Sequence, residues 1–148
     1  MNLILPVPDK PTPYQEGLLH WIWKSRHFDL SGLYTVEGLP LTILDPGIHN
    51  HSDGPDFLNA NIKIGSIRWF GDVEIHWREQ DWNLHRHHKN RGFNQVVLHV
   101  VYDAPRNKNK APVLRQDQTR IPTLHLRPFL KEPLQSFLER FNRPGALP

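Results

Sequence analysis

The segment FLNANIKIGSIRWFGDVEIHW, residues 57–77, decides the fold because it predicts two β-strands joined by a tight turn. Both halves, 57–64 and 67–77, are rich in the β-branched and aromatic side chains that favour strands. Gly65 and Ser66 between them suit the two-residue turn of a β-hairpin. We therefore predict an antiparallel hairpin near the middle of the chain.

Hydrophobic periodicity predicts further elements on both sides of the hairpin. Residues 94–102 hold a nearly continuous apolar run, which is typical of a strand buried on both faces. The other predicted elements are helices over residues 14–27 and 131–142, a short helix from Asp81, and strands over residues 33–36, 41–44 and 121–126. The pattern favours one α/β (α+β) domain over residues 14–130, with an irregular proline-rich lead-in (1–13) and a C-terminal helix and tail (131–148).

Composition excludes several classes of site. The chain of 148 residues has no cysteine, which excludes a disulfide framework, a zinc ribbon and a cysteine nucleophile. No segment approaches the ~20 apolar residues of a membrane span, so we expect a cytoplasmic protein without a membrane partner. The net charge of +3 and the five basic residues within 106–120 are compatible with a nucleic-acid partner, although such a charge run also suits a solvated loop.

Two carboxylates on the neighbouring strands of the hairpin form the first candidate site. Asp56 opens one strand and Glu74 lies inside the other, and hard oxygen ligands of this kind suit Mg²⁺ or Mn²⁺. Glu16 on the first predicted helix is a candidate third ligand. His76 shares a strand face with Glu74, where it could orient or deprotonate a water molecule. These residue types in this order suit metal-assisted phosphodiester cleavage.

The register of the hairpin sets a structural condition on this site. A simple two-residue turn pairs Ile64 with Ile67 and therefore places Phe57 opposite Glu74. Asp56 would then point to the other side of the sheet. A one-residue bulge would bring the two carboxylates together, and Gly71 is a suitable place for it.

The same two acidic residues also have purely structural interpretations. Asp56 follows Pro55 and can stabilise a turn. Glu74 can be an exposed strand carboxylate that pairs with Arg68 or Arg78. Residue types alone leave both interpretations open.

The histidine-rich stretch after the hairpin forms a second candidate site. On a helix, His85 and His88 would share one face, and together with Asp81 they suit a transition metal such as Zn²⁺. The alternative is a solvated polar helix. His49 and His51 lie in a loop that could fold over the same site or stabilise a turn.

Several motifs in one order resemble a bacterial family named domain of unknown function 2851. The similarity runs from about residue 14 to about residue 130. The motifs that carry it are EGLLHWIWK (16–24), PGIHN (46–50), GPDF (54–57), GDVEIH (71–76), Asp81-Trp82, His85 and VVLHVV (96–101). The family has no established activity, so the resemblance implies no function by itself.

More distantly, the order of helix, three strands, helix and strand resembles the core of the PD-(D/E)XK nuclease superfamily. That resemblance implies that Asp56 and Glu74 are the metal ligands and that Glu16 assists them. His76 stands where the superfamily pattern has lysine, and Lys63 on the preceding strand is a candidate for the missing cation.

Three functions therefore stand as expectations. The first is a nuclease or phosphodiesterase that depends on Mg²⁺ or Mn²⁺. The second is a catalytically inactive nucleic-acid-binding or assembly module of the same fold. The third is a transition-metal hydrolase that uses His76, His85 and His88.

Overall fold

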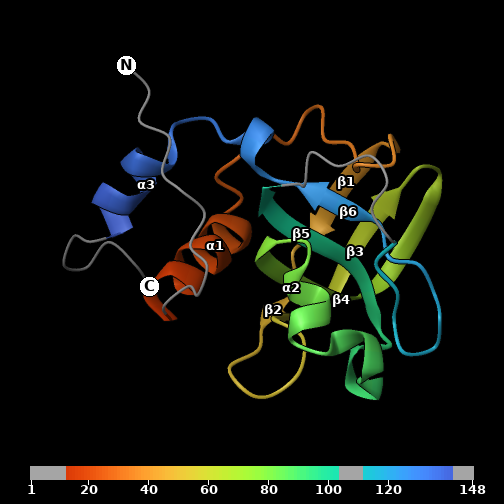
Figure 1. Ribbon diagram of the computed structural model, residues 1–148. Coiled ribbons are helices and arrows are strands. Elements are labelled where there is room, and N and C mark those ends of the chain that lie inside the picture. Colours follow the sequence, from red (N-terminus) through yellow and green to blue (C-terminus); the bar gives the residue numbers. More distant parts are fainter. Residues whose placement is uncertain (1–12, 104–111, 142–148) are drawn as a thin grey trace.

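The computed structural model describes residues 13–103 and 112–141, which form an α+β structure (Figure 1). The helices are α1 (Pro13–Ser25), α2 (Asp81–Leu84) and α3 (Leu134–Phe141), and the strands are β1 (Leu41–Asp45), β2 (Ile48–His49), β3 (Phe57–Ile64), β4 (Ile67–Arg78), β5 (Val96–Asp103) and β6 (Thr123–His125). Three short 3₁₀ helices complete the described elements: η1 (His87–Lys89), η2 (Arg91–Phe93) and η3 (Arg127–Phe129). No helix within the described ranges is long and apolar enough to cross a membrane.

The six strands form one mixed, curled sheet in the order β1-β3-β4-β5-β6, with β2 paired to β3. The pairs β1–β3 and β3–β4 are antiparallel, whereas the pairs β4–β5 and β5–β6 are parallel. Helices α1 and α2 both contact β4, and α1 also contacts α3 (Figure 1). Strand β4 is therefore the strand that both α1 and α2 contact.

Most of the predicted elements are present, with shifted ends. The hairpin strands 57–64 and 67–78 and the buried strand β5 confirm the prediction. The predicted strand 33–36 is reduced to a single bridge between Tyr34 and Pro40. The predicted C-terminal helix begins at Leu134, after Pro133, rather than at residue 131. Residues 1–12 of the predicted lead-in, the basic residues 106–110 and the tail (142–148) lie outside the described residues, whereas Pro13 begins α1.

Strands β3 and β4 change register along their length. Three pairs define the change: Ile64 with Ile67, Ala60 with Gly71, and Phe57 with Val73. The first pair confirms the predicted two-residue turn. Between the second and third pairs, β3 has one residue more than β4, so β3 carries the bulge that the candidate site requires.

The bulge lies in β3 and not at Gly71. Asn59 adopts a left-handed conformation (φ 58°), which asparagine tolerates better than most residues. Its backbone N–H donates to Oδ1 of Asp72 across the strands at 3.2 Å. The extra residue brings Asp56 next to Glu74, which is the convergence that an unbulged hairpin would prevent.

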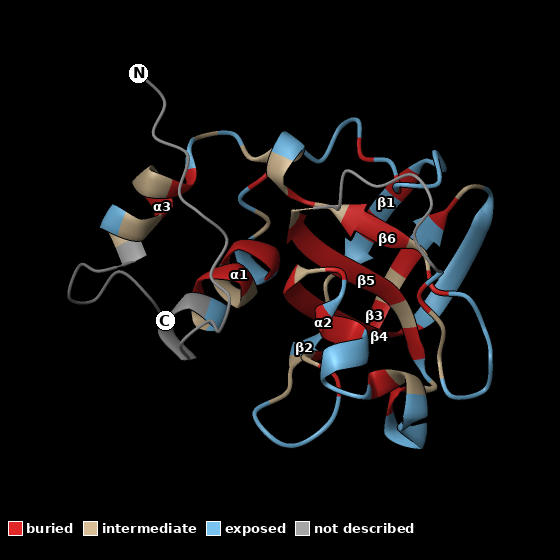
Figure 2. Ribbon diagram, in the orientation of Figure 1, coloured by how far each residue is buried: buried red, intermediate tan, exposed pale blue. Residues whose placement is uncertain are grey.

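Two hydrophobic cores lie within the described part, and Figure 2 shows buried residues on α1, on α2 and along the sheet. The main core joins α1 to the sheet, with Leu18, Ile22 and Trp23 all fully buried. The second core is smaller and consists of Trp82, Phe93, Val96, Val113 and Ile121. It fixes the segment from α2 to η2 on the sheet, and that segment carries three histidines.

Candidate metal centre

Asp56 and Glu74 are adjacent across the β3–β4 pair. The backbone N–H of Asp56 donates to Oε1 of Glu74 at 3.1 Å. The backbone N–H of Ile75 donates to Oδ2 of Asp56 at 2.8 Å. Each carboxylate is thus oriented by the neighbouring strand, and the expected convergence of these two side chains is present.

Three histidines form the one group within the described residues whose ligand atoms are close enough for a shared metal ion. The nitrogens of His76, His85 and His87 lie within 4.8 Å of one another. His76 comes from β4, whereas His85 and His87 follow the short helix α2. We call these three residues the histidine cluster.

The conformation of Arg86 explains why His87 joins the cluster in place of His88. Helix α2 ends at Leu84, and Arg86 is left-handed (φ 60°), so no helix extends over residues 85–88. His85 and His88 therefore do not share a helix face, and the prediction of that pair is wrong. The backbone reversal turns His87 inward, where it is buried.

Glu74 supplies a carboxylate to the histidine cluster. Its Oε2 atom lies 2.7 Å from Nε2 of His87 and 3.3 Å from Nε2 of His76. The shorter contact lies off the line of a hydrogen bond, and both ring nitrogens of His87 are buried without a hydrogen-bond partner. Buried polar atoms in folded proteins are normally satisfied, so these orphaned nitrogens fit a site built for a ligand.

His99 stands behind His76 on β5. Nδ1 of His76 and Nε2 of His99 are 2.7 Å apart, and His99 is fully buried. A proton on Nδ1 of His76, shared with His99, leaves the Nε2 lone pair of His76 directed toward the cluster. Metal-binding histidines are commonly oriented by such a contact at the other ring nitrogen.

A second set of polar groups approaches from helix α1. Nε2 of His20 lies 3.4 Å from Oδ1 of Asp56. His20 and Glu16 line a small pocket together with His76 and His85. The pocket encloses about 10 Å³, which is room for one water molecule or ion and not for an organic ligand.

Burial controls the proton affinities in the cluster. It lowers the pKa of His76 well below its usual value, with a further contribution from His99, and it lowers the pKa of His87 to about 4. Both rings are therefore neutral near pH 7, which is the form that binds metals. Burial and the neighbouring Asp56 raise the pKa of Glu74 well above its usual value.

Asp56 and Glu16 differ in their proton affinity. Burial favours the neutral form of Asp56, but the contact with His20 and the hydrogen bonds with Glu74 and Ile75 together outweigh it and leave the pKa of Asp56 below its usual value. Burial raises the pKa of Glu16, and this is the largest influence on it. Two nearby carboxylates with opposite shifts are common where proton transfer occurs.

The remaining predicted residues lie at varying distances from the cluster. Lys63 is exposed and lies roughly 20 Å along β3 from Asp56, so it does not supply a cation there. His49 packs against His20, with ring centroids 4.9 Å apart, and the ring of His51 lies beside that of His49 at a tilt of 49°. Asp81 lines the small pocket next to His85, and its Oδ2 accepts the backbone N–H of Arg78.

Sequence reasoning missed His20 and the orienting contact of His99, and it placed His87 in the histidine-rich stretch without giving it a ligand role. The position of His20 carried a signal, because it lies four residues after Glu16 and so shares its helix face. No pattern in the sequence indicates the inward position of His87, because that position depends on the backbone conformation of Arg86. His99 lies in the apolar strand β5, where its ring is hydrogen bonded to His76.

Comparison with known proteins places the chain in a family and gives no further relatives. The family model described as "Protein of unknown function (DUF2851)" matches residues 16–145. No curated protein and no solved structure matches the chain. Function must therefore be argued from the geometry of the site.

Proposed function

The chain belongs to the DUF2851 family of proteins of unknown function, and we propose that it is a hydrolase that depends on a transition metal and acts on phosphodiesters. One observation carries the proposal: three ring nitrogens converge within 4.8 Å, with Oε2 of Glu74 beside two of them. Three nitrogens and one carboxylate are the donors that zinc enzymes commonly use.

The donor set favours a transition metal over magnesium. Imidazole nitrogens suit Zn²⁺, Fe²⁺ and Cu²⁺, whereas Mg²⁺ prefers oxygen ligands and retains water. The expectation of Mg²⁺ or Mn²⁺ was based on the carboxylates alone. Because three of the four proposed ligands are histidines, we place Zn²⁺ first among the candidate metals.

The histidine cluster and Glu74, together with His20 and Glu16 of the small pocket, would divide the chemical roles of hydrolysis. The histidine cluster and Glu74 would hold the ion, which supplies an acidic water molecule near neutral pH. His20, held at its other side by Asp56, is the candidate base for the proton of that water. Glu16, whose pKa is raised, is the candidate proton donor to the leaving group.

The choice of a phosphodiester rests on the charges around the site. Arg86, Lys89 and Arg91 are exposed on the same segment that carries His85 and His87. Such cations bind the backbone of a nucleic acid through its phosphates. Carbonyl substrates such as peptides would not require them.

The adjacent carboxylates Asp56 and Glu74 favour one second candidate. A PD-(D/E)XK-like nuclease would use this pair with Mg²⁺, and the element order and the pair itself support that proposal. The departures from it are His76 at the lysine position and the remote Lys63. A module that has the fold without activity would bind nucleic acid and cleave nothing.

Replacing His85 by alanine is expected to lower Zn²⁺ affinity by about 10–100-fold, because even outer partners of a metal site contribute this much. His85 is exposed, so its loss removes a ligand with little effect on the core. Titration calorimetry with Zn²⁺, Mn²⁺ and Mg²⁺ measures the change. Hydrolysis of bis(para-nitrophenyl) phosphate by the Zn²⁺-loaded protein should fall in parallel.

His88→Ala is the matched control because His88 belongs to the same segment but not to the cluster. Its Zn²⁺ affinity should equal that of the wild type. Equal affinities in His85→Ala and the wild type would contradict the metal centre. Cleavage with Mg²⁺ but not with Zn²⁺ would favour the carboxylate nuclease instead.

Zn²⁺ binding is expected to release protons and to strengthen as the pH rises above the ordinary carboxyl range. Because its pKa is raised, Glu74 keeps its proton to a higher pH than an ordinary carboxyl group does, and a bound metal must displace that proton. His87, with a pKa of about 4, needs no deprotonation above that pH. Calorimetry in two buffers of different ionisation enthalpy counts the protons, and identical heats in both would refute the prediction.

A further inference from the structure

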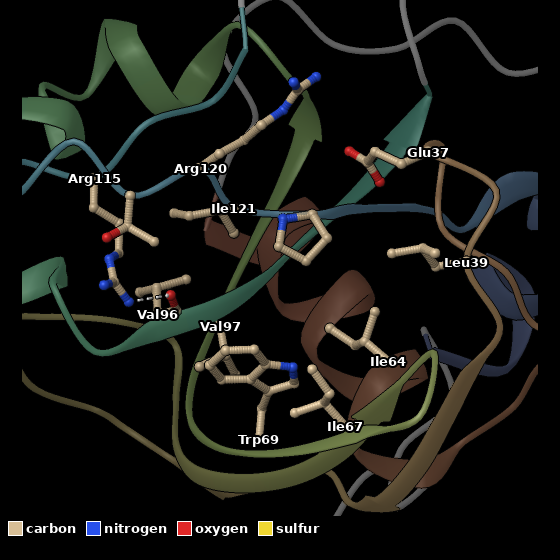
Figure 3. A pocket seen from close by; sticks show the side chains of 12 residues that line it. Glu37, Leu39, Ile64, Ile67, Trp69, Val96, Val97, Arg115, Arg120 and Ile121 are labelled. Carbon is tan, nitrogen blue, oxygen red and sulfur yellow. Dashed lines mark hydrogen bonds between the residues drawn. The ribbon is translucent and has the colours of Figure 1, made fainter.

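A second pocket lies at the turn end of the β3–β4 hairpin, apart from the histidine cluster (Figure 3). It has a volume of about 310 Å³, within the range of about 300–1,000 Å³ typical of small-molecule sites. None of its lining residues lines the small histidine pocket. Its contents therefore need not be the substrate of the proposed hydrolase.

The floor of this pocket is apolar and comes from adjacent strands. Ile64 ends β3, Ile67 and Trp69 begin β4, and Val97 lies at the start of β5. Figure 3 shows the Trp69 ring along the floor, with Val97 and Ile67 beside it. The side chains of Ile67 and Trp69 remain 55% and 45% exposed, so the fold leaves this apolar surface uncovered. Exposed apolar surface of this kind commonly marks a binding site.

The opposite wall is formed by the loop before β6. Ile121 and Pro122 continue the apolar lining, and Ile121 also belongs to the second core, which fixes its position. A backbone bridge between Leu114 and Arg120 closes this loop. The second core and the backbone bridge thus hold this wall in position, and the pocket is already formed without a ligand.

The charged residues around the pocket differ in whether they already make hydrogen bonds or ion pairs within the protein. Arg115 donates to both carboxylate oxygens of Asp117, at 3.1 Å and 2.9 Å, and to the carbonyl of Val96 at 3.2 Å. Glu37 accepts the backbone N–H of Thr123 at 3.3 Å. Arg120 is exposed at the rim and its side chain makes no hydrogen bond or ion pair with another described residue. Within the described residues, Arg120 is therefore a cation without an ion pair at the rim of an apolar floor, and Glu37 also lines the pocket.

We propose that this pocket binds a small organic anion with a flat apolar body, such as an aromatic carboxylate. The body would lie against Trp69, Ile67 and Val97, where it removes exposed apolar surface from water. The anionic group would meet the guanidinium of Arg120 at the rim, whose planar donors suit a carboxylate. Arg115 would remain with Asp117.

Calorimetric titration of the wild-type protein with 2-naphthoate tests the pocket, with the neutral 2-naphthylmethanol as its uncharged counterpart. Trp69→Ala should weaken both ligands by about tenfold or more, because an aromatic floor is lost. Arg120→Gln should weaken the anion alone by about three- to fivefold, which is the range of a solvent-exposed ion pair.

Two matched variants keep the test specific. Phe70→Ala removes the neighbouring exposed aromatic residue of β4, which does not line this pocket. Arg91→Gln removes an exposed arginine outside the pocket. Both should bind 2-naphthoate as the wild type does. No binding at about millimolar 2-naphthoate, equal weakening by Phe70→Ala and Trp69→Ala, or equal loss of both ligands in Arg120→Gln would each overturn the proposal.

Discussion

Replacing Glu74 by glutamine is expected to lower Zn²⁺ affinity by more than about 100-fold and to abolish metal-dependent hydrolysis. Glu74 is the carboxylate that approaches two rings of the histidine cluster, at 2.7 Å and 3.3 Å. Glutamine has almost the same shape, but it carries no negative charge to balance the metal. The same calorimetric titration and phosphodiester assay measure both effects.

The stability of the Glu74→Gln protein separates a functional role from a structural one. Burial raises the pKa of Glu74, so ionising it inside the fold destabilises the metal-free protein as the pH rises above the ordinary carboxyl range. The amide removes this cost and can still accept the N–H of Asp56 through its oxygen. Thermal denaturation should therefore show a melting temperature at neutral pH that equals or exceeds that of the metal-free wild type.

Asp72→Asn is the matched control for this variant. Asp72 lies two residues earlier on β4, is also buried, and accepts a backbone N–H that asparagine can still receive. Its Zn²⁺ affinity should match the wild type. Wild-type Zn²⁺ affinity in Glu74→Gln would remove the carboxylate from the proposed metal centre.

The strands of the hairpin were predictable because their signals are local. The two-residue turn at Gly65 and Ser66 fixes which residues face each other, and the apolar run of β5 specifies a strand buried on both sides. The strand expected over 33–36 failed because it has only one bridge, between Tyr34 and Pro40, to hold it in the sheet. Strand formation there depends on a partner that local propensity does not reveal.

The candidate site was predictable only in part, because two backbone irregularities build it. Asp56, Glu74 and His76 could be chosen from residue type and strand alternation. The bulge at Asn59, which makes the carboxylates meet, was recognised as a requirement, but Gly71 was the position considered for it. The reversal at Arg86, which brings His87 in and leaves His88 out, had no signal in the residue pattern.

A third irregularity, between β4 and β5, positions His99 next to His76. Asp72 pairs with Val96 and Val73 pairs with Leu98, so Val97 is the extra residue of a bulge in β5. Val96 consequently packs in the second core whereas Leu98 packs in the main one. The same shift places His99 opposite Glu74, within reach of His76.

Gly71 allows the β5 bulge to approach β4, and Gly71→Ala is therefore expected to destabilise the fold by about 3 kcal/mol. A Cβ atom at Gly71 would lie 2.5 Å from the carbonyl oxygen of Gln95 and 2.5 Å from Cγ1 of Val97. That carbonyl accepts the N–H of Asp72 at 2.8 Å, so it cannot move without breaking a sheet contact. Urea denaturation followed by circular dichroism measures the loss.

Gly32→Ala separates this clash from a general loss of glycine, since nothing lies within 4 Å of a Cβ there. Its stability should stay within about 0.5 kcal/mol of the wild type. Because the bulge also places His99 behind His76, the folded fraction of Gly71→Ala should bind Zn²⁺ more weakly, while Gly32→Ala binds normally. Unchanged stability in Gly71→Ala would mean that the β4–β5 register tolerates a side chain at this position. Reduced stability with undiminished Zn²⁺ affinity would mean that the orientation of His76 does not depend on His99.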